Sequence, residues 1–188
     1  MKSHTFMFFR DFTVPLLLGI KTMTIRGIRK RMPKVGDQMD QRCWEGKSYR
    51  SKQAKIQVVP IREVKLVSLH LSVHRGWVQY RGSGQVLSAR ADLDAFAQRD
   101  GFDEWKKLVR FFICQGRPQK FDGVLFGWEA SDVARPVGEG QSVEETDRMI
   151  LEVVANSQPF PSIVAEVVEA LREKYQRAGI PAVRTEKP

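Results

Sequence analysis

Short β-prone segments separated by turn residues dominate the first 130 residues, and they constrain the fold more than any other feature. Valine, isoleucine, threonine and aromatic side chains favour pleated strands. Glycine, proline and short polar residues punctuate the sequence between these segments. The predicted strands cover residues 3–9, 38–45, one or two stretches within 55–73, residues 77–80 and residues 121–128.

Two helical regions interrupt the strands. Asp11 can cap a short helix that runs to Ile20, and Gly19 lies near its end. Between Leu93 and Phe112 the apolar residues recur at helical spacing, and Gly101 separates two halves. Many short strands around short helices favour a small barrel over a sandwich or a βαβ sheet. The predicted fold class is therefore mainly β (α+β), a β-barrel with two short flanking helices, followed by a C-terminal helical pair.

The last third of the chain differs in composition. Residues 131–141 contain Pro136, Gly138 and Gly140, which is typical of a linker. We predict one domain over residues 1–130, the linker over 131–141 and a C-terminal helical extension over 142–188. An apolar stripe in the second helix of this extension needs a surface to cover it, on the barrel or on a partner. A protein-interaction module is thus one alternative function, through Ile163, Val167 and Leu171.

Composition excludes several classes of protein. The apolar run from Val14 to Ile20 is far shorter than the roughly 20 residues of a transmembrane helix, and no secretory signal is evident. Cys43 and Cys114 are too few for a disulfide framework. No cysteine or histidine pair has zinc-finger spacing, so neither metal nor cofactor is expected. We expect a cytoplasmic protein without a membrane partner.

Charge is distributed unevenly along the chain. Residues 1–90 contain 18 Lys and Arg against 5 Asp and Glu, whereas residues 91–188 contain 13 against 17. The basic half is a candidate surface for a polyanion. Cations gather at Arg29, Lys30, Arg31 and Lys34, and again at Lys47, Arg50, Lys52 and Lys55.

Aromatic residues are interleaved with the second basic cluster. Trp44 and Tyr49 stand among its cations, as stacking platforms do in proteins that bind single strands. In the alternative interpretation, without ligand binding, the charged loops are merely solvated and Trp44 belongs to the core. The candidate ligand-binding residues are Arg26, Arg29, Lys30, Arg31, Trp44 and Lys52.

Several motifs in order resemble the ASCH domain family. Residues 16–26, LLLGIKTMTIR, are similar to the signature of that family, and Val35-Gly36-Asp37 resembles the turn after it. The segments around Asp100-Gly101-Phe102 and from Phe121 to Trp128 resemble its C-terminal half. The resemblance covers about 130 residues. It implies a PUA-like β-barrel with a cleft that takes RNA or a modified nucleoside.

Within that family the signature is closest to small bacterial amidohydrolases that remove the acetyl group from N(4)-acetylcytidine. Lys21 and Thr24 match the first two catalytic positions of those enzymes, and Asp100 stands where they have a glutamate. The resemblance therefore implies Lys21, Thr24 and Asp100 as candidate catalytic residues, and amide hydrolysis of an acylated pyrimidine as an alternative to binding alone.

The same three residues also fit purely structural roles. A lysine at the end of a helix interacts favourably with the helix dipole. Thr24 is β-branched and suits a strand, and Asp100 before Gly101 suits a turn. The sequence leaves open whether the protein is an enzyme or a binding module.

Overall fold

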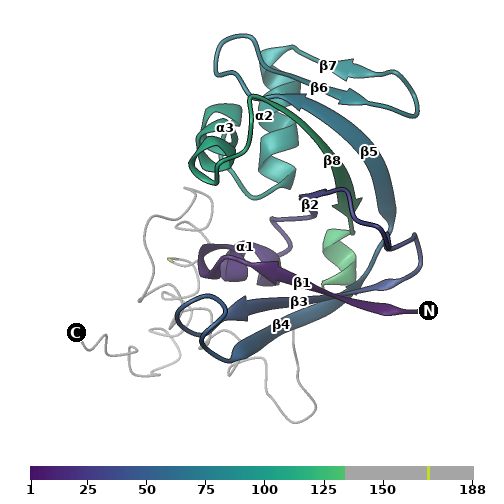
Figure 1. The fold of residues 1–188 in the computed structure, drawn as a ribbon, viewed down its shortest axis with the longest axis vertical. Coiled ribbons are helices and arrows are strands. Elements are labelled where there is room, and N and C mark those ends of the chain that lie inside the picture. The colour runs from purple at the N-terminus through teal and green to yellow at the C-terminus, as the bar shows by residue number, and fades with distance from the viewer. Residues whose placement is uncertain (134–168, 170–188) are drawn as a thin grey trace.

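The computed structural model of the protein describes residues 1–133 and Glu169 (Figure 1). The predicted helical extension over 142–188, with the stripe of Ile163, Val167 and Leu171, lies outside the described residues apart from Glu169. The described strands form two sheets, and the mainly β fold class is confirmed. In the part that the structure describes, no helix is long and apolar enough to cross a membrane.

The smaller sheet has three strands in the order β1–β3–β4. β1 runs parallel to β3, with Ser3 opposite Gln38, and β3 runs antiparallel to β4. The helix α1 packs against this sheet through Val14 and Leu16, which are completely buried. The elements of this half are β1 (Ser3–Phe8), the 3-10 helix η1 (Arg10–Phe12), α1 (Thr13–Leu17), β3 (Gln38–Trp44) and β4 (Gln53–Pro60).

The larger sheet has five strands in the order β2–β8–β5–β6–β7, and all its pairs are antiparallel. Helices α2 and α3 pack on this sheet, as the upper half of Figure 1 shows. Its elements are β2 (Met23–Gly27), β5 (Glu63–His70), β6 (Trp77–Tyr80), β7 (Val86–Leu87), α2 (Arg90–Arg99), α3 (Trp105–Cys114) and β8 (Lys120–Gly127), followed by the 3-10 helix η2 (Ala130–Asp132).

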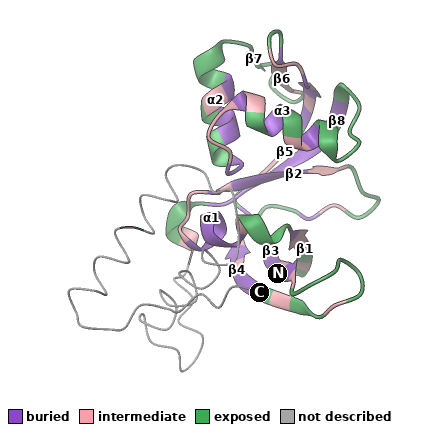
Figure 2. Ribbon diagram, turned by 90° about the vertical axis from the view of Figure 1, so that its left-hand side faces the viewer, coloured by how far each residue is buried: buried purple, intermediate pink, exposed green. Residues whose placement is uncertain are grey.

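The described core consists of two apolar clusters that meet at β8. One lies between α1 and the three-stranded sheet, and the other lies under α2 and α3. Along β8 the side chains alternate, so that Val124 and Phe126 belong to the first cluster and Leu125 to the second. Figure 2 shows β2 buried at the waist between the two halves. Side chains on this waist therefore face either half of the molecule.

Candidate functional site

Lys21 and Asp100 form a buried ion pair. Lys21 lies between α1 and β2, where its backbone N–H donates to the carbonyl of Pro15 at 2.9 Å. Asp100 ends α2. The ammonium of Lys21 donates to both the carboxylate and the backbone carbonyl of Asp100, and the two residues are only 2% and 3% exposed. Charged groups are rarely buried to this extent, and then only when paired.

The backbone next to Asp100 is shaped to admit the lysine side chain. Gly101 has a φ of +84°, which favours glycine, and a Cβ there would lie 3.3 Å from the Lys21 side chain. On the other side the ammonium lies 4.4 Å from the centre of the Phe12 ring. A cation that close to an aromatic face is attracted by it. The lysine is thus enclosed by a ring, a glycine and a carboxylate.

Burial shifts the pKa of both partners in opposite directions. Desolvation lowers the pKa of Lys21, and the charge and hydrogen bond of Asp100 offset part of that effect. Desolvation likewise raises the pKa of Asp100, and Lys21 offsets part of it. Arg26 adds a smaller electrostatic effect that lowers the pKa of each. A lysine and a carboxyl with converging pKa values can exchange a proton between them, as acid–base catalysts do.

Strand β2 directs two polar side chains away from α2 and α3. Met23 and Ile25 join the cluster under α2 and α3. Because strand side chains alternate, Thr24 and Arg26 lie on the opposite face. Thr24 is 5% exposed and pairs with Phe126 of β8. The strand therefore turns one hydroxyl and one guanidinium toward the half that contains the three-stranded sheet.

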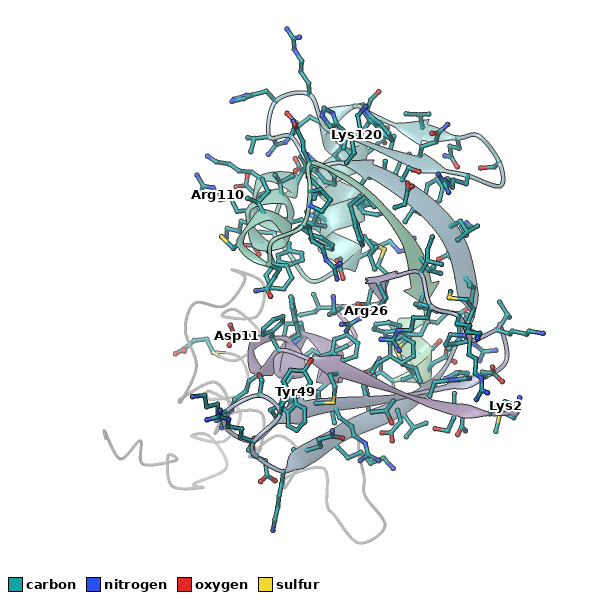
Figure 3. All side chains as sticks on the ribbon, viewed as in Figure 1. Lys2, Asp11, Arg26, Tyr49, Arg110 and Lys120 are labelled. Carbon is teal, nitrogen blue, oxygen red and sulfur yellow. The ribbon has the colours of Figure 1, made fainter. Side chains whose placement is uncertain are left out.

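Arg26 lies at the centre of the molecule, between the two halves (Figure 3). Its Nη2 donates to the carbonyl of Met7 at 2.8 Å, and its guanidinium lies 4.8 Å from the centre of the Phe8 ring. Its Nε is buried and has no hydrogen-bond partner among the described residues. Burial lowers the pKa of Arg26 to about 10, so the side chain remains cationic at neutral pH. A buried donor without a partner calls for an explanation, and a water molecule or a ligand group that reaches it would provide one.

Arg26 forms part of the wall of a pocket of about 700 Å³. Sites for small molecules commonly have volumes of roughly 300–1,000 Å³. The walls come from β1 and η1, from β2, from the hairpin between β3 and β4, and from α3 with the segment after it. Among the described residues, six aromatic side chains line it, namely Phe8, Phe9, Trp44, Tyr49, Phe111 and Phe112, together with the cations Arg10, Arg26 and Arg117.

The structure brings some of the predicted site residues together and separates others. Arg26 and Trp44 line the pocket. Lys21, Thr24 and Asp100 are buried and do not line it. Phe8 lies near both places, because its ring centre is 5.9 Å from the Lys21 ammonium and 4.8 Å from the Arg26 guanidinium. The remaining candidates are exposed and are not among the lining residues, namely Arg29, Lys30, Arg31 and Lys52.

Several lining residues were not candidates from the sequence, above all Phe9, Phe111 and Arg117. The adjacent phenylalanine pairs at 8–9 and 111–112 could have indicated these residues from the sequence. Neighbouring residues in a strand point to opposite faces, and a helix buries only one stripe. One ring of each pair must then leave the core. Phe9 is 49% exposed and packs edge-on against Phe111, with ring centres 5.4 Å apart.

The arrangement combines flat apolar rings with guanidinium donors in one pocket, next to a buried acid–base pair. Rings stack on planar ligands, and guanidinium groups bind carbonyl oxygens or phosphates. Comparison of the chain with protein-family models, with curated proteins and with solved structures finds no match, so this geometry is the ground for assigning a function.

Proposed function

We propose that the pocket binds a nucleobase, in a modified nucleoside or in RNA. The observation that carries this proposal is the meeting of Arg26, with its unpartnered Nε, and several aromatic rings around about 700 Å³. A base can stack on Trp44 or a phenylalanine, while the guanidinium donates to its carbonyl oxygen or to a phosphate. The net charge of +9 favours a ligand that carries phosphate.

The same proposal assigns the chain to the ASCH family, with its two sheets as parts of a PUA-like barrel. The contact between Lys21 and Asp100 supports it, because these residues are 79 positions apart, Lys21 matches the family signature, and Asp100 stands where the amidohydrolases of that family have a glutamate. The placement of Thr24 and Arg26 on one face of β2 supports it as well.

Nucleoside binding tests the pocket directly. We expect cytidine and its modified derivatives to bind, and Arg26→Gln to weaken the binding by about 10- to 100-fold, because a hydrogen bond from a charged group contributes roughly 1.5–3 kcal/mol. Trp44→Ala should weaken binding by about 5- to 150-fold through lost stacking. Isothermal titration calorimetry with a panel of nucleosides measures both effects.

Trp77→Ala is the matched control, because Trp77 lies in β6 and is not among the residues that line the pocket. Its affinity for the same nucleosides should equal that of the wild type. Equal losses in Trp44→Ala and Trp77→Ala would mean that the aromatic pocket is not the binding site, and the proposal would have to be abandoned.

The exposed cations Arg29, Lys30 and Arg31 support RNA as the larger ligand. With about four phosphates neutralised, log K for single-stranded RNA should fall against log salt with a slope of about −3. Replacing these three residues by Ala should flatten the slope, since fewer counterions are then released. The control neutralises three exposed cations on or next to β5 and β6, Lys65, Arg75 and Arg81, which do not line the pocket. A slope that is unchanged in the first variant contradicts this role for the loop.

Hydrolysis of an acylated cytidine is a second candidate, favoured by the buried pair of Lys21 and Asp100. In this scheme Lys21 first passes a proton to Asp100, which leaves both side chains neutral. The Thr24 hydroxyl then attacks the acyl carbon and passes its proton to the Lys21 amine. The C–N bond breaks, and the departing exocyclic nitrogen takes a proton from the Asp100 carboxyl. Water then hydrolyses the acyl-threonine ester and releases the acid. Lys21, Thr24 and Asp100 are buried and do not line the pocket, so hydrolysis requires the acyl group to reach past the pocket wall, whereas binding alone requires only the pocket.

A further inference from the structure

Tyr49 has an unusual backbone conformation. Its φ is +63°, and it is the only residue other than glycine with a positive φ in the part of the chain that the structure describes. Left-handed backbone is uncommon for a bulky residue, and such conformations gather at functional sites. The positive φ places the Tyr49 side chain at the tip of the hairpin between β3 and β4.

Hydrogen bonds hold this hairpin loop in place. The backbone N–H groups of Arg50 and Ser51 both donate to the carbonyl of Lys47 at 3.1 Å. The Ser51 hydroxyl donates to the same carbonyl at 3.1 Å and accepts from the N–H of Gly46 at 3.0 Å. The loop is therefore fixed by local bonds that do not involve the Tyr49 side chain.

The Tyr49 ring is almost fully open to solvent although it lines the pocket. It is 89% exposed, and its ring centre lies 5.4 Å from that of Trp44 at an angle of 48°. Figure 3 shows Tyr49 on the hairpin, below Arg26 and outside the waist. Trp44 is partly buried and forms the pocket wall. The two rings thus form a step from the pocket toward solvent.

Cations flank this step. Lys47, Arg50 and Lys52 are exposed on the same hairpin, and none forms an ion pair with another residue of the range 1–133. Exposed rings among unpaired cations suit a ligand in which flat groups alternate with phosphates. A free nucleoside has one base and no phosphate, so it could not use this surface.

We propose that the natural ligand is a single strand of RNA, with one base in the pocket and the base of the adjoining nucleotide stacked on Tyr49. This inference rests on the proposed nucleobase pocket and names the class of ligand that it takes. Lys47 and Arg50 lie where they can neutralise the phosphate between the two nucleotides. The strained backbone at Tyr49 holds the ring where the second base can stack on it.

Three ligands and two substitutions test the proposal. The affinities of wild type, Tyr49→Phe and Tyr49→Asn are measured for three ligands. These are cytidine, an RNA dinucleotide that contains cytidine, and a six-nucleotide single strand of RNA. Asparagine tolerates a positive φ, so Tyr49→Asn keeps the loop and removes only the ring, whereas phenylalanine keeps the ring. We expect Tyr49→Asn to bind the dinucleotide and the single strand about 10-fold more weakly or worse, and Tyr49→Phe to bind within about twofold of wild type.

Cytidine affinity separates this proposal from the one on which it rests. Because Tyr49 also lines the pocket, Tyr49→Asn is expected to weaken the binding of cytidine by much less than it weakens the binding of the dinucleotide, whereas Tyr49→Phe keeps the ring for both ligands. Equal losses for cytidine and the dinucleotide in Tyr49→Asn would limit the role of Tyr49 to the pocket wall and overturn the proposal of a second stacked base. Cytidine binding with no gain for the dinucleotide would overturn it too, with the nucleobase pocket intact. A wild type that binds none of the three ligands removes both.

Discussion

Lys21→Met and Asp100→Asn are each expected to lower the free energy of unfolding by about 3–5 kcal/mol, because either change leaves an unpaired charged group in the interior. The double variant should lose less than the sum of the two, with a coupling free energy of up to about 3 kcal/mol. Chemical denaturation of the four proteins measures this cycle. Lys107 and Asp103 give a matched control, because they form an exposed ion pair in which either loss is expected to cost less than about 1 kcal/mol.

The two single variants should respond to pH in opposite directions. In Lys21→Met the remaining Asp100 has a pKa raised above its ordinary 3.8, so the folded state holds a proton that the unfolded state releases, and stability falls as pH rises above 3.8. In Asp100→Asn the remaining Lys21 has a pKa lowered from 10.5, so the unfolded state binds more protons and stability rises as pH approaches 10.5. Parallel pH profiles for the two variants would contradict the buried pair.

The hydrolysis candidate predicts that the protein converts N(4)-acetylcytidine to cytidine and acetate. Thr24→Val should then slow turnover by at least about 10²- to 10⁴-fold, since it removes the nucleophile and keeps the shape of the side chain. Chromatography of the nucleosides measures the rate. Thr24 is a better test than Lys21, whose substitution is expected to destabilise the fold.

Thr13→Val is the control for that substitution. Thr13 is 7% exposed, and its hydroxyl has no hydrogen-bond partner among the described residues, so the same chemical change in α1 should leave turnover unaffected. The rate should rise with pH as Lys21 loses its proton and fall as Asp100 loses its own, which gives a bell-shaped profile. Nucleoside that binds without turnover leaves the pocket as a binding site and removes the hydrolase.

Local sequence signals accounted for most of the elements. The strand predicted over residues 3–9 is β1, and the helical region from Leu93 to Phe112 divides at Gly101 into α2 and α3, as expected. The stretch 55–73 holds parts of two strands, because Ile61 leaves the sheet and its N–H donates to Asp37 at 2.8 Å.

The strand β2 was not predicted, because its pairing comes from far along the chain. It has only five residues. Pairing with β8 extends the strand through Arg26 and Gly27. The location of Trp44 also needed the structure, since it is partly buried and lines the pocket as well, and spacing alone does not distinguish the core from a stacking platform.

The pairing of β2 with β8 also determines when the site can form during synthesis. Met23 lies opposite Gly127, so a nascent chain leaves the ribosome with β2 unpaired until β8 has followed about a hundred residues later. Until then an apolar strand edge is open to other chains. Lys21 and Arg26 stand on either side of its buried residues, and charges at an open edge discourage intermolecular pairing. We therefore expect these two cations to lower the tendency of the unfinished chain to aggregate.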